Sequence, residues 1–262
     1  MIGSKFNLKN YIRKKHLINS DNKKLSKSYK KIFQEVNLEI ENPKKTLNIF
    51  SKKFKFNFNF KDLKKFRNFE KIALIGMGGS ILGAAAIYGF FGAKVKKKIF
   101  FFDNLDEDKI KNFKKKEKLS NILFIIISKS GNTIETLTNF FSINIIKKKP
   151  KNIIAVSEKR NSELYSLSKK FNLFHIEHRQ NIGGRYSVLS EVGIIPAYLM
   201  GINIFKLRSK ILDCINYKNK SIMKESTIKL YDLMKSKKYN NLILLNYSPE
   251  LEKFLFWYQQ LI

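Results

Sequence analysis

Cysteine, acidic residues and long apolar runs are all scarce in this chain of 262 residues. The single cysteine, Cys214, excludes an internal disulfide, and we expect its thiol to be buried or half-buried on a helix of a cytoplasmic protein. No run of about 18 uncharged apolar residues occurs, and the first residues hold no apolar stretch of signal-peptide length. We therefore expect no membrane partner.

Acidic residues are outnumbered, with 21 Asp and Glu against 52 Lys and Arg, and the formal net charge is +31. A basic protein of this kind can bind nucleic acid by neutralising phosphates. Only six of its basic residues are arginines, however, and arginine is the side chain favoured for bidentate contacts with phosphates and bases. The lysines are spread along the whole chain among Asn, Ile and Phe, as an A+T-rich coding sequence would produce. We therefore expect no specific nucleic-acid partner.

The pattern of apolar and charged residues changes at Lys71, and we predict three parts of the chain. Residues 1–70 are lysine-rich and mostly helical, and the alternating run 54–60 is expected to be an irregular or helical linker. In residues 71–205, short apolar runs alternate with helical-period stretches, which is typical of a parallel sheet covered by helices. Residues 206–262 are expected to hold linker helices and the truncated start of a second α/β domain.

The middle part predicts an α/β fold, a three-layer α/β/α doubly wound sheet of five parallel strands. We expect strands at 71–75, 98–102, 121–127, 152–156 and 173–176, and helices at 79–91, 106–116, 133–146, 161–170 and 187–200. Pro196 should kink or stop the last helix. A further strand is expected at 241–246, followed from Pro249 by a helix with nothing to pack against.

The turn Gly76-Met77-Gly78-Gly79-Ser80 directly follows the first strand and opens a helix. Glycines at such a turn let an anion approach backbone N–H groups at the positive end of the helix. A dinucleotide fold is the rival interpretation, with Asp103 after the second strand as the ribose ligand. That fingerprint requires glycine where this chain has Ile81, so we do not expect a nicotinamide cofactor.

In a second loop, directly after the third strand, every residue except Gly131 has a side chain that can donate a hydrogen bond. Three hydroxyls, an amide, a lysine and a glycine can together surround a phosphate dianion. The alternative is a simple capping loop, in which Asn132 or Ser130 caps the next helix. The loop residues are Ser128, Lys129, Ser130, Gly131, Asn132 and Thr133.

The positions of the two loops favour the binding interpretation. If the strand order is 2-1-3-4-5, the first and third strands are neighbours and the topological switch point lies between them. A third motif, Gly183-Gly184-Arg185-Tyr186-Ser187, follows the fifth strand. Its Arg185 can face an anionic or developing-anion centre, and a structural ion pair is the alternative.

The run from Asn181 to Gly193, with its Gly-Gly-Arg-Tyr-Ser core, closely resembles a signature of the glucose-6-phosphate isomerase (phosphoglucose isomerase) family. The Gly-x-Gly-Gly-Ser turn and the Ser-Lys-Ser-x-x-Thr loop are similar to two other landmarks of that family, in the same order. Any one of these motifs is weak, whereas the ordered set of three is specific. Residues 71–205 look like the first sugar-isomerase domain of the family.

The resemblance implies an enzyme that interconverts glucose 6-phosphate and fructose 6-phosphate through a cis-enediolate, without a metal or other cofactor. It also implies a homodimer for the full-length protein. Arg185 would stabilise the enediolate, and Gln260 would contact the substrate just before a segment that carries the catalytic base. The residues that would bind the sugar phosphate are Gly79, Ser80, Ser128, Lys129, Ser130, Gly131, Asn132, Thr133 and Gly184.

The chain departs from the family pattern at its end. The glutamate base and the ring-opening histidine belong to family segments beyond Ile262, so we expect this chain to be a fragment that binds a sugar phosphate without turning it over. His175 and His178 are expected to be surface or strand-end residues, and Glu135 and Glu191 to have helix-surface or packing roles. Two other functions stay open: a non-catalytic sugar-phosphate-binding regulatory module, and a bifunctional phosphoglucose/phosphomannose isomerase.

Overall fold

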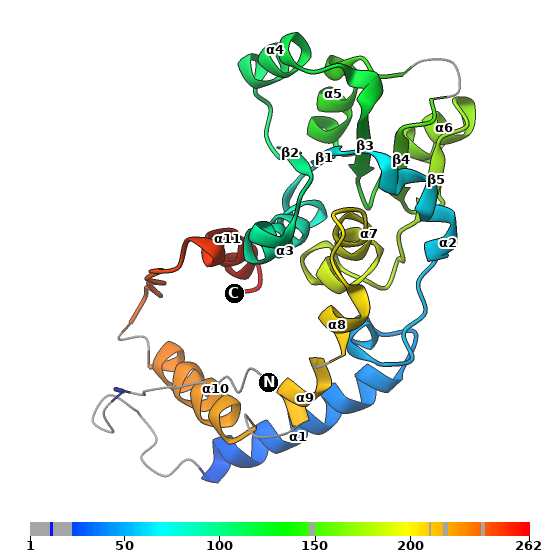
Figure 1. The fold of residues 1–262 in the computed structure, drawn as a ribbon. Coiled ribbons are helices and arrows are strands. Elements are labelled where there is room, and N and C mark those ends of the chain that lie inside the picture. Colours follow the sequence, from blue (N-terminus) through cyan, green and yellow to red (C-terminus); the bar gives the residue numbers. More distant parts are fainter. Residues whose placement is uncertain (1–10, 13–22, 147–149, 210, 217–219, 237–238) are drawn as a thin grey trace.

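A computed structural model describes residues 11–12, 23–146, 150–209, 211–216, 220–236 and 239–262 of the chain. At its centre is a parallel sheet of five strands in the order β2-β1-β3-β4-β5 (Figure 1). The strands are β1 (Lys71–Gly76), β2 (Lys98–Phe102), β3 (Ile122–Ile127), β4 (Ile153–Ser157) and β5 (Phe174–Glu177). The predicted strands and their assumed order are confirmed.

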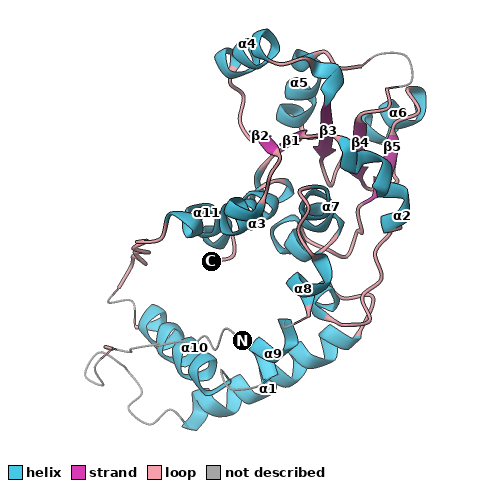
Figure 2. Cartoon of the chain, viewed as in Figure 1, coloured by secondary structure: helices cyan, strands magenta, loops and turns pink. Residues whose placement is uncertain are grey.

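Helices cover both faces of this sheet, which makes the three layers that the sequence predicts (Figure 2). One face packs on α2 (Phe60–Leu63), α3 (Leu82–Phe91) and α7 (Glu191–Leu199), through side chains such as Leu63, Ala84 and Ile195. The other face packs on α4 (Glu107–Lys116), α5 (Ile134–Ile143) and α6 (Glu163–Lys170), through Phe113, Phe140 and Leu164. All six residues of β3 are buried, because this strand has a neighbour on each side and a helical layer on each face.

The remaining helices flank this core. They are α1 (Lys23–Glu41), α8 (Ile204–Arg208), α9 (Ile211–Asn216), α10 (Lys220–Lys235) and α11 (Glu252–Gln259). Helix α1 lies in the N-terminal part that was expected to be mostly helical, and α9 contains Cys214, whose side chain lies outside the described part. Residues 1–10 and 13–22 of the predicted N-terminal part also lie outside it. Helix α7 begins at Glu191, four residues later than predicted, and continues through Pro196 to Leu199, so the early stop expected at Pro196 is not found.

Two expectations for the C-terminal part are wrong. Residues 241–246 form no strand, because no neighbouring strand in the described part supplies the hydrogen bonds that a strand needs, and Ile243 is 76% exposed. Helix α11 does have a surface to pack against, since it lies along α3 (Figure 1). A β-carbon on Gly89 would lie 3.2 Å from the carbonyl oxygen of Glu250, which shows how closely the chain entering α11 approaches α3.

Candidate active site

The first two motifs begin side by side at one edge of the sheet. Gly76, the last residue of β1, is paired in register with Ile127, the last residue of β3. A β-carbon on Gly76 would lie 2.9 Å from the carbonyl oxygen of Ile127. The turn 76–80 and the loop 128–133 therefore leave neighbouring strands at the same level, where the topological switch point of this strand order lies.

The helices that start from these loops have open N-termini. Neither α3 nor α5 has a side chain that caps its first turn. By contrast, α4 is capped by Asp106, whose side chain accepts from the N–H of Lys109, and α7 is capped by Ser190. The unpaired N–H groups and the positive dipole ends of α3 and α5 are thus available to an anion at the switch point.

The hydroxyl groups of the loop 128–133 converge on one another. The Oγ of Ser128 lies 2.9 Å from the Oγ1 of Thr133 and accepts the N–H of Gly131 at 3.1 Å. The Oγ of Ser130 lies 3.5 Å from the same threonine oxygen. Gly131 has a φ of +72°, a conformation that favours glycine, and a β-carbon there would lie 2.2 Å from the Oγ of Ser162. The loop therefore gathers three hydroxyls immediately before α5.

The two longer side chains of this loop are engaged elsewhere. The Oδ1 of Asn132 accepts the N–H of Glu163 at 2.9 Å and so caps α6. The Nζ of Lys129 donates to the carbonyl oxygen of Gln180 at 2.7 Å and lies 3.7 Å from the carboxylate of Glu158. The alternative interpretation, in which Asn132 or Ser130 caps the next helix α5, is wrong, because the side chain of Asn132 reaches α6 instead.

The third motif lies against the first. A β-carbon on Gly79 would lie 2.4 Å from the carbonyl carbon of Gly184 and 2.7 Å from the nitrogen of Arg185. The Oγ of Ser187 donates to the carbonyl oxygen of Gly184 at 2.6 Å and approaches that of Gly79 at 3.3 Å. These contacts hold the backbone before Arg185 directly on the turn that follows β1.

Arg185 and Gln260 both lie at this junction. The side chain of Arg185 is exposed, and among the described residues no carboxylate lies within ion-pair distance, so the structural ion pair considered for it is not found. The indole Nε1 of Trp257 in α11 donates to the carbonyl oxygen of Arg185 at 2.9 Å. A β-carbon on Gly78 would lie 3.1 Å from the Nε2 of Gln260, whose Oε1 is buried without a hydrogen-bond partner. Helix α11 thus brings an unsatisfied amide oxygen next to the turn 76–80.

Comparison with known proteins agrees with this arrangement of motifs. A family model described as phosphoglucose isomerase matches residues 13–262, which is nearly the whole chain. The chain belongs to the phosphoglucose isomerase family. It is 36% identical over 212 residues to a probable glucose-6-phosphate isomerase of Methanococcus maripaludis, and 31% identical over 220 residues to a glucose-6-phosphate isomerase of Methanocaldococcus jannaschii. These matches cover 74% and 79% of this chain.

This phosphoglucose isomerase family chain spans about half the length of these relatives, 47% of the first and 53% of the second. Among solved structures, a hypothetical protein of Thermus thermophilus matches with a TM-score of 0.60 and 18% sequence identity. The match covers 81% of this chain and 54% of that one. At this identity the likeness shows the fold alone, and it agrees with the five-stranded α/β architecture.

The two described histidines of this family member lie on β5 and just after it. His175 is on β5 and His178 directly follows it, as the strand-end interpretation predicts, although His178 is buried rather than at the surface. The Nε2 of His175 lies 2.9 Å from the Oγ of Ser157. Burial and the nearby charge of Lys159 lower the pKa of His175 to about 4, so its ring is neutral at pH 7.

Of the two glutamates for which helix-surface or packing roles are expected, Glu191 is buried and packs, and Glu135 lies exposed on α5. The carboxylate of Glu191 is 1% exposed, accepts the N–H of Asn57 at 2.9 Å and lies 3.5 Å from the Nε of Arg179. Burial raises its pKa above the ordinary value. The sequence contained no signal for the contact with Asn57, because the two residues lie more than a hundred positions apart.

Two features are absent from the described part of the chain. No group of three or more His, Cys, Asp or Glu side chains in that part of the chain is arranged to hold a metal ion. No helix there combines the length and the apolar character needed to cross a membrane.

Proposed function

We propose that this chain is the sugar-phosphate-binding part of a glucose-6-phosphate isomerase, which interconverts glucose 6-phosphate and fructose 6-phosphate. The observation that carries the proposal is the backbone contact between Gly79 and Gly184, which joins the Arg185 loop to the turn beside the hydroxyl loop. Family membership and the names of the relatives support the reaction. Because the chain spans about half of those relatives, turnover by the whole protein is part of the proposal.

The phosphate group would bind between the N-termini of α3 and α5. Donors would be the hydroxyls of Ser128, Ser130 and Thr133, together with the backbone N–H of Gly79, since the N–H groups of Ser80 and Gly131 already donate to Met77 and Ser128. Each hydrogen bond to a charged group contributes roughly 1.5–3 kcal/mol. Three or four of them could hold a sugar phosphate at micromolar to millimolar concentrations once the costs of binding are subtracted.

Lys129 and Asn132 would act differently from the hydroxyls. Their side chains already bind Gln180 and Glu163, and the N–H of Asn132 donates to the Oγ of Ser130, so we assign both residues the role of shaping the loop. The ammonium group of Lys129 still adds positive potential near the phosphate, although Glu158 offsets part of it.

The chemistry of the exchange would take place beside Gly184 and Arg185. Removal of the C2 proton of the open-chain sugar leaves an enediolate, and reprotonation at C1 completes the isomerisation. A guanidinium next to the developing oxyanion lowers the barrier without being consumed, and the backbone of Arg185 is held at this junction. The amide of Gln260 would orient the sugar through its unsatisfied Oε1.

We assign the base that removes the C2 proton to none of the described residues. Glu191 is enclosed by Asn57 and Arg179, and Glu135 is exposed on α5, so neither faces the junction of Gly79 and Gly184. The family membership also leads us to propose a cytoplasmic homodimer for the full-length protein.

The binding proposal is tested by thermal unfolding of the chain with increasing glucose 6-phosphate. The sugar phosphate should raise the melting temperature by mass action, and Ser128→Ala combined with Thr133→Ala should abolish this rise. Thr138→Ala, an exposed change on the same helix α5, is the matched control and should leave the rise intact. A rise that persists in the double variant would show that the phosphate binds elsewhere.

A further inference from the structure

Strand β2 forms an open edge of the sheet, with β1 as its neighbour on the other side. The N–H of Lys98 donates to the carbonyl oxygen of Glu70 at 3.0 Å. The N–H and C=O groups of Lys98, Phe100 and Phe102 therefore point toward β1. Peptide groups alternate along a strand. Ile99 and Phe101 therefore direct their N–H and C=O groups outward, away from the sheet.

A cavity of about 1140 Å³ runs along this edge. Every residue from Lys98 to Asp103 lines it. Because successive side chains point to opposite faces of a sheet, a cavity that touches all of these residues lies beside the edge and not on one face. It occupies the position that a sixth strand would take next to β2.

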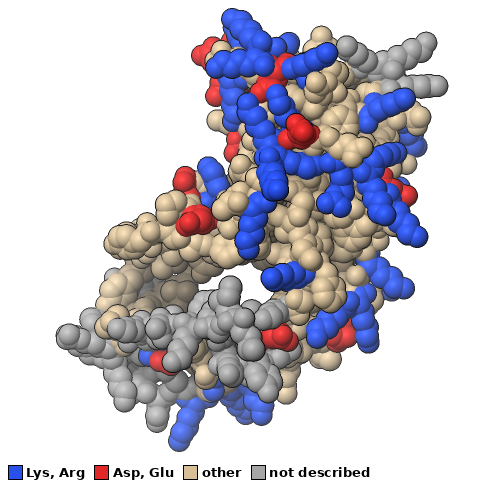
Figure 3. Space-filling model, viewed as in Figure 1, with Lys and Arg blue, Asp and Glu red and all other residues tan. Residues whose placement is uncertain are grey.

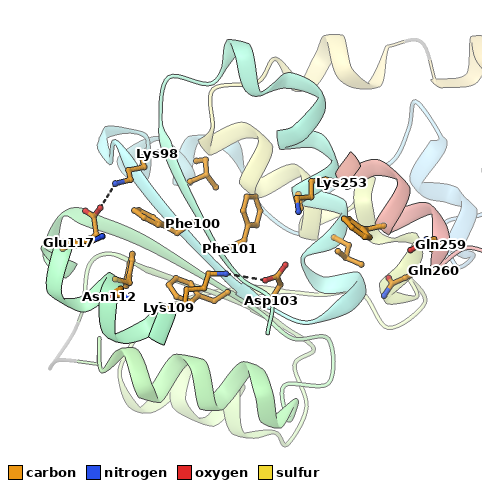
Figure 4. A pocket seen from close by; sticks show the side chains of 17 residues that line it. Lys98, Phe100, Phe101, Asp103, Lys109, Asn112, Glu117, Lys253, Gln259 and Gln260 are labelled. Atoms are coloured by element: carbon orange, nitrogen blue, oxygen red, sulfur yellow. Dashed lines mark hydrogen bonds and ion pairs between the residues drawn. The ribbon is translucent and has the colours of Figure 1, made fainter. Parts of the chain in front are cut away.

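The walls of the cavity are the two helical layers, which extend beyond the edge of the sheet (Figure 4). Helix α4 forms one wall through Asn112, Phe113 and Lys116. Helices α3 and α11 form the other, through residues that include Leu82 and Phe256. The walls are thus mainly apolar close to the strand, as the two faces of a buried strand require.

Lysines surround the opening. Lys98, Lys109, Lys116 and Lys253 line the cavity, against the carboxylates of Asp103 and Glu117. Glu117 is already held by two lysines, at 2.6 Å from Lys71 and 2.8 Å from Lys98, and these bonds keep its pKa below the ordinary value. Lys109 lies 3.8 Å from Asp103 and Lys253 lies 3.9 Å from Glu252, so among the described residues Lys116 is the lining lysine without an ion-pair partner. Around α4 the surface carries basic side chains interspersed with acidic ones, among them Glu107 and Asp108 in the first turn of the helix (Figure 3).

We infer that the β2 edge binds an extended, acidic segment of a partner protein as a sixth strand of the sheet. The outward peptide groups of Ile99 and Phe101 supply main-chain hydrogen bonds, and the lysines select glutamate or aspartate side chains at the rim. A second copy of this chain is a poor occupant, because it would bring the same lysines against one another. Gln260 lines one end of the cavity, which therefore adjoins the proposed sugar-phosphate site, but the inference rests on the β2 edge alone.

The probe is a fluorescein-labelled eight-residue peptide of alternating glutamate and valine, titrated with the full chain and followed by fluorescence anisotropy. We expect this peptide to bind and the matching lysine–valine peptide not to bind. N-methylation of the alternate amides that face β2 should weaken binding by about tenfold, because each methyl group removes a main-chain hydrogen bond. Equal binding of the methylated peptide, or competition by inorganic phosphate, would overturn the inference in favour of a general anion site.

Two protein variants test the position of the peptide. Lys116→Glu should weaken binding about fivefold or more, by removing an attraction and adding a repulsion, whereas Lys115→Glu, its exposed neighbour outside this cavity, should have little effect. Ile99→Pro removes an outward N–H without removing a bond to β1 and should weaken binding further. Equal effects of Lys115→Glu and Lys116→Glu would overturn the inference even if the proline variant failed to fold.

Discussion

The backbone of Gly79 lies against the carbonyl group of Gly184, with no room for a side chain between them. A β-carbon on Gly79 would lie 2.4 Å from the carbonyl carbon of Gly184 and 2.6 Å from its oxygen. Both neighbours are backbone atoms, which cannot rotate away as a flexible side chain could. This contact makes two distant motifs into one candidate site.

Gly79→Ala should therefore separate the two loops. We expect a loss of about 1–3 kcal/mol in unfolding free energy from the steric conflict, and loss of the stabilisation by glucose 6-phosphate. Urea unfolding with and without the sugar phosphate measures both effects. Gly92→Ala is the matched control, because a β-carbon there meets nothing within 4 Å and its φ is −51°. Undiminished sugar-phosphate binding by Gly79→Ala would contradict the proposed role of this contact.

Asn132 allows stability and binding to be separated within the phosphate loop. Asn132→Ala removes the cap of α6 and should cost about 1 kcal/mol of unfolding free energy while glucose 6-phosphate still binds. Asn132→Asp keeps an acceptor for the N–H of Glu163 but places a negative charge beside the phosphate, so stability should be kept and binding weakened. The reverse pattern would mean that the amide of Asn132 contacts the ligand directly.

The buried carboxylate of Glu191 joins three segments of the chain. Its partners are Asn57 and Arg179. Close to it in the sequence, the carbonyl oxygen of Leu189 accepts a hydrogen bond from the guanidinium of Arg208 at 2.7 Å. Because Glu191→Gln removes the ionic partner of the partly exposed Arg179 and weakens a buried acceptor, it should cost about 1–3 kcal/mol of unfolding free energy.

A double-mutant cycle with Arg179→Gln should then show a coupling above about 1 kcal/mol. The exposed pair Glu107 and Lys111 is the control and should couple weakly. Strict additivity of Glu191→Gln and Arg179→Gln would mean that their proximity contributes nothing to stability.

His175 makes stability depend on pH. Its pKa is lowered from 6.5 to about 4 in the folded chain, so on acidification the unfolded chain takes up the proton first. The contribution of the neutral ring to the free energy of unfolding is fully present above pH 6.5 and is lost as the pH falls toward 4. Urea unfolding between these pH values should show a smaller decline in stability for His175→Asn than for the unchanged chain. An identical decline would place the titrating group elsewhere.

Much of the core and the three loops could be predicted from sequence because the signals are local. The apolar run 122–127 bounded by polar residues predicts a buried strand, and glycines or hydroxyls directly after strands predict the ends where ligands bind. The strand order had to be assumed from the fold type, and the structure confirms it.

Contacts between distant segments could not be predicted in this way. The contact of Glu191 with Asn57 and the packing of α11 on α3 depend on which surfaces meet, and no periodicity in the sequence encodes that. The prediction of a strand at 241–246 is wrong for a different reason. The apolar pattern of a strand is present, but the described part holds no neighbouring strand that pairs with it.

The most direct test of the account is to ask which backbone amides respond to the ligand. In ¹H–¹⁵N correlation spectra of the chain titrated with glucose 6-phosphate, the amides of Gly79, Ser80, Gly131, Thr133 and Arg185 should shift together and saturate with one dissociation constant. Glucose without the phosphate should leave them in place. Shifts confined to other residues, or different dissociation constants for the three loops, would contradict a single sugar-phosphate site.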